Sequence, residues 1–145
     1  MIYFDMDGTI ADLYKDPAWL EKLRAYDATP YASAEVLVNM NSLAKAIHKV
    51  QNKGHQVGII SWLSKESTEE YDRAVIKAKR DWLKRHLRSV RFDDIQIVAH
   101  GTPKSSVAKH PITDILFDDE LANREEWKGQ AYAPEKIFEI LRNIS

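Results

Sequence analysis

The sequence predicts an α/β fold in which a parallel sheet is flanked by helices, and two observations support this prediction. Short apolar runs rich in β-branched residues recur at residues 2–4, 57–60, 95–98 and 115–117, with a weaker run at 130–132. Segments with apolar residues at helical spacing separate most of these runs. Right-handed crossovers between parallel strands place the loops that follow the strands at one edge of the sheet. We therefore expect polar residues that directly follow the strands to gather at that edge.

Each expected helix has apolar residues that recur three or four positions apart, so that one face can be buried. These residues are Met40, Leu43, Ile47 and Val50 before the second strand, Tyr71, Val75, Ala78, Trp82 and Leu87 after it, and Ile137, Phe138, Ile140 and Leu141 near the end of the chain. Gly54 ends the first of these helices, and Pro134 opens the last. Strands that alternate with such helices predict helices on both faces of the sheet.

Residues 13–38 interrupt the alternation of strands and helices. Asp16–Pro17 is typical of an N-cap followed by a first helical turn, and Trp19 and Leu23 continue a short amphipathic helix. Thr29–Pro30 should end that helix. Because the segment comes soon after the first strand, we expect it to overhang the carboxyl edge of the sheet. The alternative is a helix that packs on the edge of the domain.

The composition is that of one soluble globular domain, spanning residues 1–145. It is 44% hydrophobic and 30% charged, with a formal net charge of −1, which favours neither nucleic acid nor membrane as a partner. The absence of cysteine excludes disulfides and thiolate metal sites, and favours a cytoplasmic location. We expect no membrane span and no signal peptide, because no apolar run approaches the roughly 18 residues of a membrane span and no basic segment precedes an apolar one at the N-terminus.

Polar residues follow the first, second and fourth strands. They are Asp5 and Asp7 in DMDGT, Ser61 in GIISWLS, and Asp118 and Asp119 in ILFDDE, and Lys104 lies in GTPKSSVA shortly before the fourth strand. Carboxylate ligands without sulfur suit a hard cation such as Mg²⁺. A lysine, a hydroxyl group and helix N-termini suit a phosphate. The combination indicates a phosphoryl-transfer site. The alternatives without a function are that the second acidic pair caps a helix starting near Glu120, that Ser61 is an ordinary turn serine, and that Lys104 is a surface lysine.

The order of these motifs resembles that of the haloacid dehalogenase-like hydrolase superfamily. The resemblance rests on DxDGT, then a serine at a strand end, then a lysine, then DD at a strand end, and it covers nearly the whole chain. It implies a Rossmann-like sheet of five parallel strands and a Mg²⁺-dependent phosphatase that forms an aspartyl-phosphate. Residues 13–38 would then be a reduced version of the cap found in many relatives.

The resemblance also implies the roles of the acidic residues. Asp5 would be the nucleophile, and Asp7 would protonate the leaving oxygen and later deprotonate the attacking water. Mg²⁺ would bind the Asp5 carboxylate, the Asp7 backbone carbonyl and a carboxylate of Asp118 or Asp119. We favour Asp119, because the metal ligand of relatives that read GD at this point aligns with the second position.

The same resemblance implies that a second set of residues binds the phosphate. Ser61 and Lys104 would hold the phosphoryl oxygens, with Thr9 in support. Lys65 competes with Lys104 for this role, and Asn123 is a further supporting residue.

The expected substrate is a small phosphorylated molecule, and the FDDE ending with the small insertion resembles 5′-deoxyribonucleotidase-type members, which suggests a nucleotide. Trp62 would then stack on a base or a sugar, or else belong to the core or pack against residues 13–38. A nucleic-acid end phosphatase is the alternative, favoured by the open site and by a basic stripe formed by residues 73, 77, 80, 84, 88 and 91. This stripe either guides a polyanion toward the site or is simply a solvated helix face. A non-catalytic phospho-ligand binding module is a third hypothesis, disfavoured by the intact acidic pair.

Overall fold

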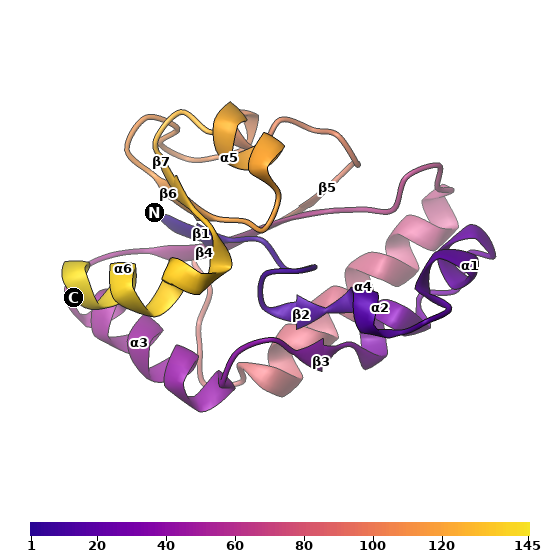
Figure 1. The fold of residues 1–145 in the computed structure, drawn as a ribbon, viewed down its shortest axis with the longest axis horizontal. Coiled ribbons are helices and arrows are strands. Elements are labelled where there is room, and N and C mark those ends of the chain that lie inside the picture. The colour runs from indigo at the N-terminus through magenta and orange to yellow at the C-terminus, as the bar shows by residue number, and fades with distance from the viewer.

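The computed structural model describes residues 1–145 and contains the predicted parallel sheet of five strands, in the order β5-β4-β1-β6-β7 (Figure 1). The strands are β1 (Ile2–Phe4), β4 (Val57–Trp62), β5 (Asp94–Val98), β6 (Ile115–Phe117) and β7 (Gln130–Tyr132). The weak fifth strand is therefore confirmed. Strand β4 ends at Trp62 rather than at residue 60, so Ser61 lies within the strand and not after it.

Alternation along β1 divides the core between the two faces of the sheet. Ile2 and Phe4 belong to the larger core, whereas Tyr3 faces a smaller cluster with Trp127. The helices α3 (Met40–Asn52), α4 (Glu69–His86) and α6 (Ile137–Ile144) cover the larger core. The short helix α5 (Leu121–Glu126) lies on the other side, as Figure 1 shows. Helices on both faces are thus confirmed, with most of the helical cover on one of them.

The helices begin where local capping allows it and bury the predicted faces. Asn39 accepts a hydrogen bond from the Ser42 amide (2.9 Å) at the start of α3, and Thr68 accepts one from the Tyr71 amide (3.1 Å) at the start of α4. All five predicted apolar residues of the long helix are buried. The same face also buries Lys79, which the apolar periodicity does not account for. No helix has the length and apolar character that crossing a membrane requires.

The insertion contains two α-helices where the sequence predicts one, and a two-stranded antiparallel sheet joins its two ends. Helix α1 (Trp19–Arg24) is followed by α2 (Thr29–Ser33), and β2 (Ala11–Asp12) pairs antiparallel with β3 (Glu35–Val36). The prediction that Thr29–Pro30 ends the first helix is wrong, because α1 already ends at Arg24 with Ala25 as its C-cap, and Tyr26 has a positive φ of 57°. Pro30 instead occupies the first turn of α2, where its missing N–H is no loss. Helix α2 packs directly against α4, and Trp19 and Leu23 of α1 pack against the buried cluster to which α4 contributes Tyr71 and Val75.

The prediction that Asp16 caps the first helix of the insertion is wrong. The N-cap position is Ala18, and the Asp16 carboxylate accepts the Ala18 N–H (2.9 Å) in a turn that precedes the helix. Pro17 has no N–H to offer the carboxylate, so the nearest free donor is the next amide.

Candidate active site

The turn after β1 brings the first acidic segment close to the segment after β6. The Met6 carbonyl accepts hydrogen bonds from the amides of residues 9–11 (3.0, 3.0 and 2.9 Å), which folds the chain sharply back. Gly8 in this turn has φ +83°, and a Cβ atom there would lie 2.2 Å from Asp119 Oδ2. Glycine is therefore required both for the turn and for the close approach of the two segments.

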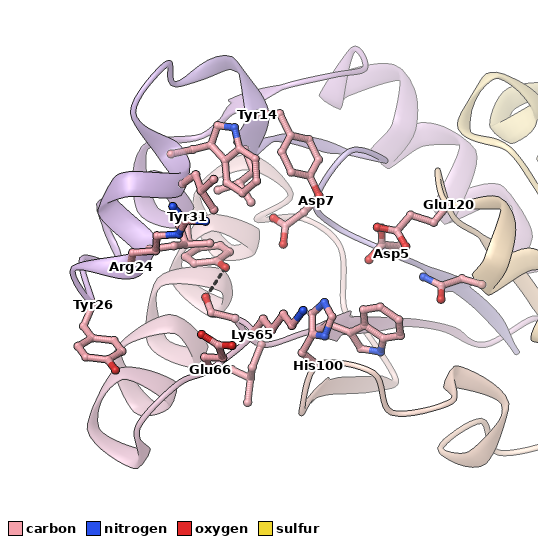
Figure 2. Close-up of a pocket in the computed structure, with 18 of the residues that line it drawn as sticks. Asp5, Asp7, Tyr14, Arg24, Tyr26, Tyr31, Lys65, Glu66, His100 and Glu120 are labelled. Carbon is pink, nitrogen blue, oxygen red and sulfur yellow. Dashed lines mark hydrogen bonds between the residues drawn. The ribbon is translucent and has the colours of Figure 1, made fainter.

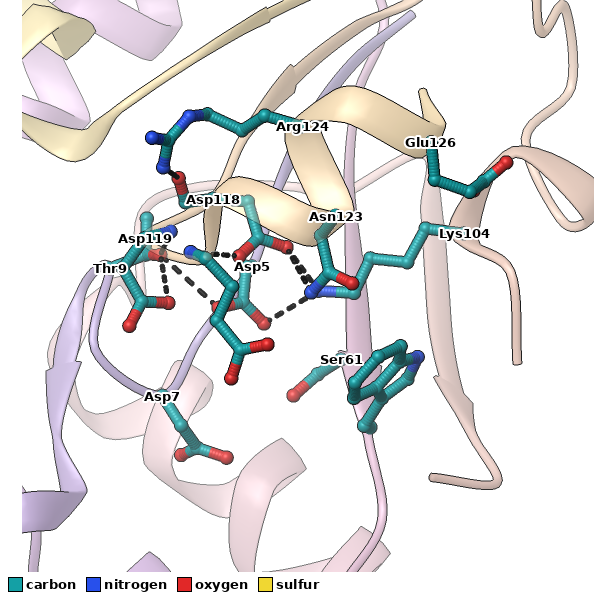
Figure 3. A network of polar contacts seen from close by, with 12 residues as sticks. Asp5, Asp7, Thr9, Ser61, Lys104, Asp118, Asp119, Asn123, Arg124 and Glu126 are labelled. Atoms are coloured by element: carbon teal, nitrogen blue, oxygen red, sulfur yellow. Dashed lines mark hydrogen bonds and ion pairs between the residues drawn. The ribbon is translucent and has the colours of Figure 1, made fainter. Parts of the chain in front are cut away.

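Lys104 joins two carboxylates at the floor of the site (Figure 3). Its Nζ donates to Asp5 Oδ1 (2.9 Å) and to Asp118 Oδ2 (2.6 Å), and all three side chains are buried. Burial alone would lower the pKa of Lys104, but the charges of the two carboxylates outweigh it and raise the pKa. The lysine therefore stays charged.

Asp118 is fully enclosed by hydrogen-bond donors. Besides the lysine, Asn123 Nδ2 donates to its Oδ2 (3.1 Å) and the Glu120 amide donates to its Oδ1 (2.9 Å). The second of these contacts is the local turn that the helix-capping alternative expects, so Asp118 serves the start of α5 and the buried cluster together. Burial and the nearby Asp5 charge raise the pKa of Asp118, and Lys104 partly offsets this.

Asp119 has fewer partners and is partly exposed. The Thr9 hydroxyl accepts its backbone N–H (3.1 Å) and also donates to Asp5 Oδ2 (3.2 Å), while Thr9 itself has no exposed surface. Oxygen atoms of Asp5, Asp118 and Asp119 all lie within 4.8 Å of one another. Burial and then the Asp5 charge raise the pKa of Asp119 to about 8. Three crowded carboxylates with a single lysine between two of them fit a hard cation, which would relieve the repulsion.

The pH dependence of stability is expected to report this crowding. The pKa of Asp119 is about 8 in the folded protein and near its ordinary value when unfolded, so the folded state binds the proton more tightly. Its contribution is fully present below about pH 4 and is lost as the pH rises through about 8. The melting temperature of the metal-free protein should therefore fall between pH 5 and pH 8. Asp119→Asn should flatten this fall, and so should Mg²⁺. An equally steep fall in Asp119→Asn would contradict the assignment.

Lys79 is the site residue that the sequence analysis missed. Its Nζ, 1% exposed, donates to Ser61 Oγ (2.6 Å), to the Trp62 carbonyl (2.7 Å) and to Asp7 Oδ2 (2.9 Å). The available signal was its position four residues after Val75, on the apolar face of the helix, where a lysine is costly without partners.

A cleft of about 530 Å³ opens above these residues, and aromatic and apolar side chains form about half of its lining, with charged and polar side chains forming the rest (Figure 2). The insertion contributes Leu13, Tyr14, Trp19, Leu20, Leu23, Arg24, Tyr26 and Tyr31. The opposite wall includes Trp62, whose indole N–H donates to the Thr102 carbonyl (2.9 Å) and whose ring lies 4.8 Å from that of His100. Asp5, Asp7 and Lys104 line the cleft, whereas Ser61 is fully buried, accepts a hydrogen bond from Lys79 and is not part of the cleft wall.

Two other groups that the sequence analysis considers are not part of the polar network at the floor of the cleft. Lys65 is exposed on the cleft wall and forms no ion pair, in contrast to Lys104 at the floor. The basic stripe of residues 73, 77, 80, 84, 88 and 91 is exposed, and none of its members lines the cleft.

No protein-family model matches the chain, and no curated protein matches it in sequence. Among solved structures, the chain is similar to the crystal structure of D,D-heptose 1,7-bisphosphate phosphatase from Burkholderia thailandensis, with a TM-score of 0.52 and 16% sequence identity. The match covers 86% of this chain and 68% of that one. Together with the strand order, this likeness confirms the haloacid dehalogenase-like fold that the motifs predict.

Proposed function

We propose that the protein is a Mg²⁺-dependent phosphomonoesterase that acts through an aspartyl-phosphate on Asp5. The observation that carries the proposal is the setting of this carboxylate at the floor of the cleft. Lys104 holds one of its oxygens and Thr9 the other, and Asp7 faces the same cleft two residues further on. A weak nucleophile fixed in this way, beside a second carboxylate able to carry protons, suits phosphoryl transfer.

The reaction would proceed in two balanced steps. Asp5 attacks phosphorus, and Asp7 gives its proton to the leaving oxygen as the phosphorus–oxygen bond breaks. Asp7 then takes a proton from water, whose oxygen bonds to phosphorus while the bond from Asp5 to phosphorus breaks. Inorganic phosphate leaves, and both carboxylates return to their starting state.

The phosphate contacts fall to Lys104 and Ser61. The charge of Lys104 would offset that of the phosphoryl oxygens, and Ser61 would need a small opening of the wall to reach them. Thr9 is better suited to positioning than to the phosphate contact expected from the sequence, because it is buried and its hydroxyl is already shared between two acidic residues. Asn123 would support the same arrangement by holding Asp118.

The carboxylates of Asp5 and Asp119, with the Asp7 backbone carbonyl, are the groups that would hold Mg²⁺. Asp119 is preferred over Asp118 because Asp118 already accepts from a lysine, an amide side chain and a backbone N–H. Bound there, the ion would reduce the repulsion between the nucleophile and the incoming phosphate.

The aromatic side chains that line the cleft favour a substrate whose leaving group has a flat apolar part, such as a nucleoside. Residues 13–38 would act as a reduced cap that supplies one wall, and Trp62, held by its hydrogen bond, would supply the other. The basic stripe lies outside the cleft, so it does not favour a nucleic-acid end as the substrate.

The test is Mg²⁺-dependent phosphate release from nucleoside monophosphates, sugar phosphates and 5′- or 3′-phosphorylated oligonucleotides. We expect the highest kcat/KM on nucleoside monophosphates. Trp19→Ala should raise the KM for them roughly tenfold, the size of one lost stacking contact, and Trp19→Phe should restore most of it. Leu121→Ala, an exposed apolar residue outside the cleft, is the control and should change nothing. Preference for a sugar phosphate with no effect of Trp19→Ala would contradict the proposed substrate class.

A further inference from the structure

The buried ammonium group of Lys79 has no part in the chemistry proposed above, yet it lies between two residues that do. An ammonium group has three N–H donors and no acceptor. Lys79 uses all three donors, on Asp7, Ser61 and the Trp62 carbonyl, and its Nζ also lies 4.9 Å from the centre of the Tyr31 ring. A lysine that is 1% exposed is costly to bury, and these contacts offset the cost.

The contact with Asp7 fixes the orientation of that carboxylate. Lys79 forms its one ion pair with Asp7 Oδ2, at 2.9 Å, and the Asp7 side chain is 17% exposed. Because Oδ2 is held by the ammonium, Oδ1 is the oxygen left free to exchange a proton with a ligand in the cleft. The pair joins the turn after β1 to the middle of α4, which are 72 residues apart in the sequence.

The contact with Ser61 fixes the direction of a hydroxyl. Lys79 can only donate, so Ser61 Oγ must accept at 2.6 Å. The single O–H of Ser61 is then left to be donated elsewhere. Phosphoryl oxygens only accept hydrogen bonds, so a serine held in this way presents the group that a phosphate needs.

We propose that Lys79 is a positioning residue for the phosphatase reaction. It holds the Asp7 carboxyl group in line for transfer of a proton to the leaving oxygen, and it makes Ser61 a hydrogen-bond donor toward the phosphoryl group. This inference rests on the proposed function, and it differs from a purely structural role because it predicts which substrates suffer when Lys79 is replaced.

The experiment compares Lys79→Met with the wild type on p-nitrophenyl phosphate and phenyl phosphate. The two esters have a similar shape, but phenol is the poorer leaving group and depends more on protonation by Asp7. We expect kcat/KM to fall for both esters, and to fall at least about tenfold further for phenyl phosphate, a part of the 10²–10⁴-fold that general acid catalysis contributes. Asp7→Asn should show the same selectivity, whereas Ser61→Ala should affect both esters equally.

Chemical rescue provides a second readout. The chain has no cysteine, so Lys79→Cys, unfolded and treated with 2-bromoethylamine before refolding, gains an aminoethyl group at that position alone and regains an ammonium of nearly the same reach. We expect the alkylated protein to recover both activity and the wild-type ratio between the two esters. Lys77→Met is the control on the same helix, because Lys77 is exposed and pairs only with Asp81.

The outcomes separate the two proposals. A wild-type protein with no Mg²⁺-dependent activity on any phosphomonoester would overturn the proposed function. An active wild type with an unchanged ratio between the esters in folded Lys79→Met would overturn the role of Lys79 and leave the function intact. Should Lys79→Met fail to fold, Lys79→Arg takes its place. Arginine keeps the charge but cannot direct three donors from one atom, so an unchanged ratio there would equally overturn the positioning role.

Discussion

Asp5→Asn is expected to lower kcat/KM roughly 10⁴-fold or more, because the amide cannot act as the nucleophile and most of the rate acceleration depends on nucleophilic attack. The side chains are nearly isosteric, and the amide oxygen can still accept the hydrogen bond from Lys104. The charge of Asp5 is among the causes that raise the pKa of Asp118 and of Asp119. Its removal should therefore leave the metal-free protein at least as stable at pH 8.

Phosphate release and thermal melting, measured on the same preparation, check this expectation. Asp81→Asn is the matched control, since Asp81 is a solvent-exposed partner of Lys77 far from the cleft. That variant should retain wild-type turnover. Undiminished Mg²⁺-dependent turnover in Asp5→Asn would exclude an intermediate on Asp5. A large loss of activity together with a collapse in melting temperature would instead mean that Asp5 serves the fold.

The acidic part of the candidate site was predictable because of the geometry of parallel sheets. Strands β1 and β6 are neighbours in register, so residues directly after them must meet at one edge. Asp5 and Asp119 therefore follow from their places after apolar runs. Lys104 lies in the connection that leaves β5 at the same carboxyl edge, so its approach to the acidic residues was also expected.

The parts that the sequence did not predict depend on packing between distant elements. Lys79 contacts Asp7 only because of the way α4 is oriented when it packs in the folded protein. Helical periodicity predicts which face of α4 is buried, but it does not predict which residues that face contacts. The antiparallel strands β2 and β3 have two residues each, too few for any alternation of apolar and polar residues to be visible. The aromatic wall of the cleft likewise follows from how the insertion docks on α4.

Lys104→Met is expected to destabilise the metal-free protein by about 3–5 kcal/mol, since two carboxylates would be left buried without their counterion. Methionine has a similar length and fills the same space, so the loss should come from charge and hydrogen bonding rather than from a cavity. For a chain of this size the melting temperature should fall by about 10 °C. Lys77→Met removes the same group from an ion pair of similar length, 2.6 Å, but on the surface, with side chains 78% and 47% exposed. The loss there should stay within about 0.5 kcal/mol.

A double variant tests the cause of this loss. In Lys104→Met with Asp118→Asn, one of the two uncompensated charges is removed. The amide oxygen introduced at position 118 can still accept the Glu120 N–H, and the acceptor that Asn123 Nδ2 loses is a smaller cost than an unpaired buried charge. The double variant should therefore be more stable than Lys104→Met alone, and Mg²⁺ should raise the melting temperature of both, because the ion supplies a positive charge to the same carboxylates. Equal losses in Lys104→Met and Lys77→Met would contradict this account. If the double variant were the less stable of the two, the Lys104 side chain would be stabilising the fold through packing. Its ammonium group would then not be the group that positions Asp5 at the floor of the cleft.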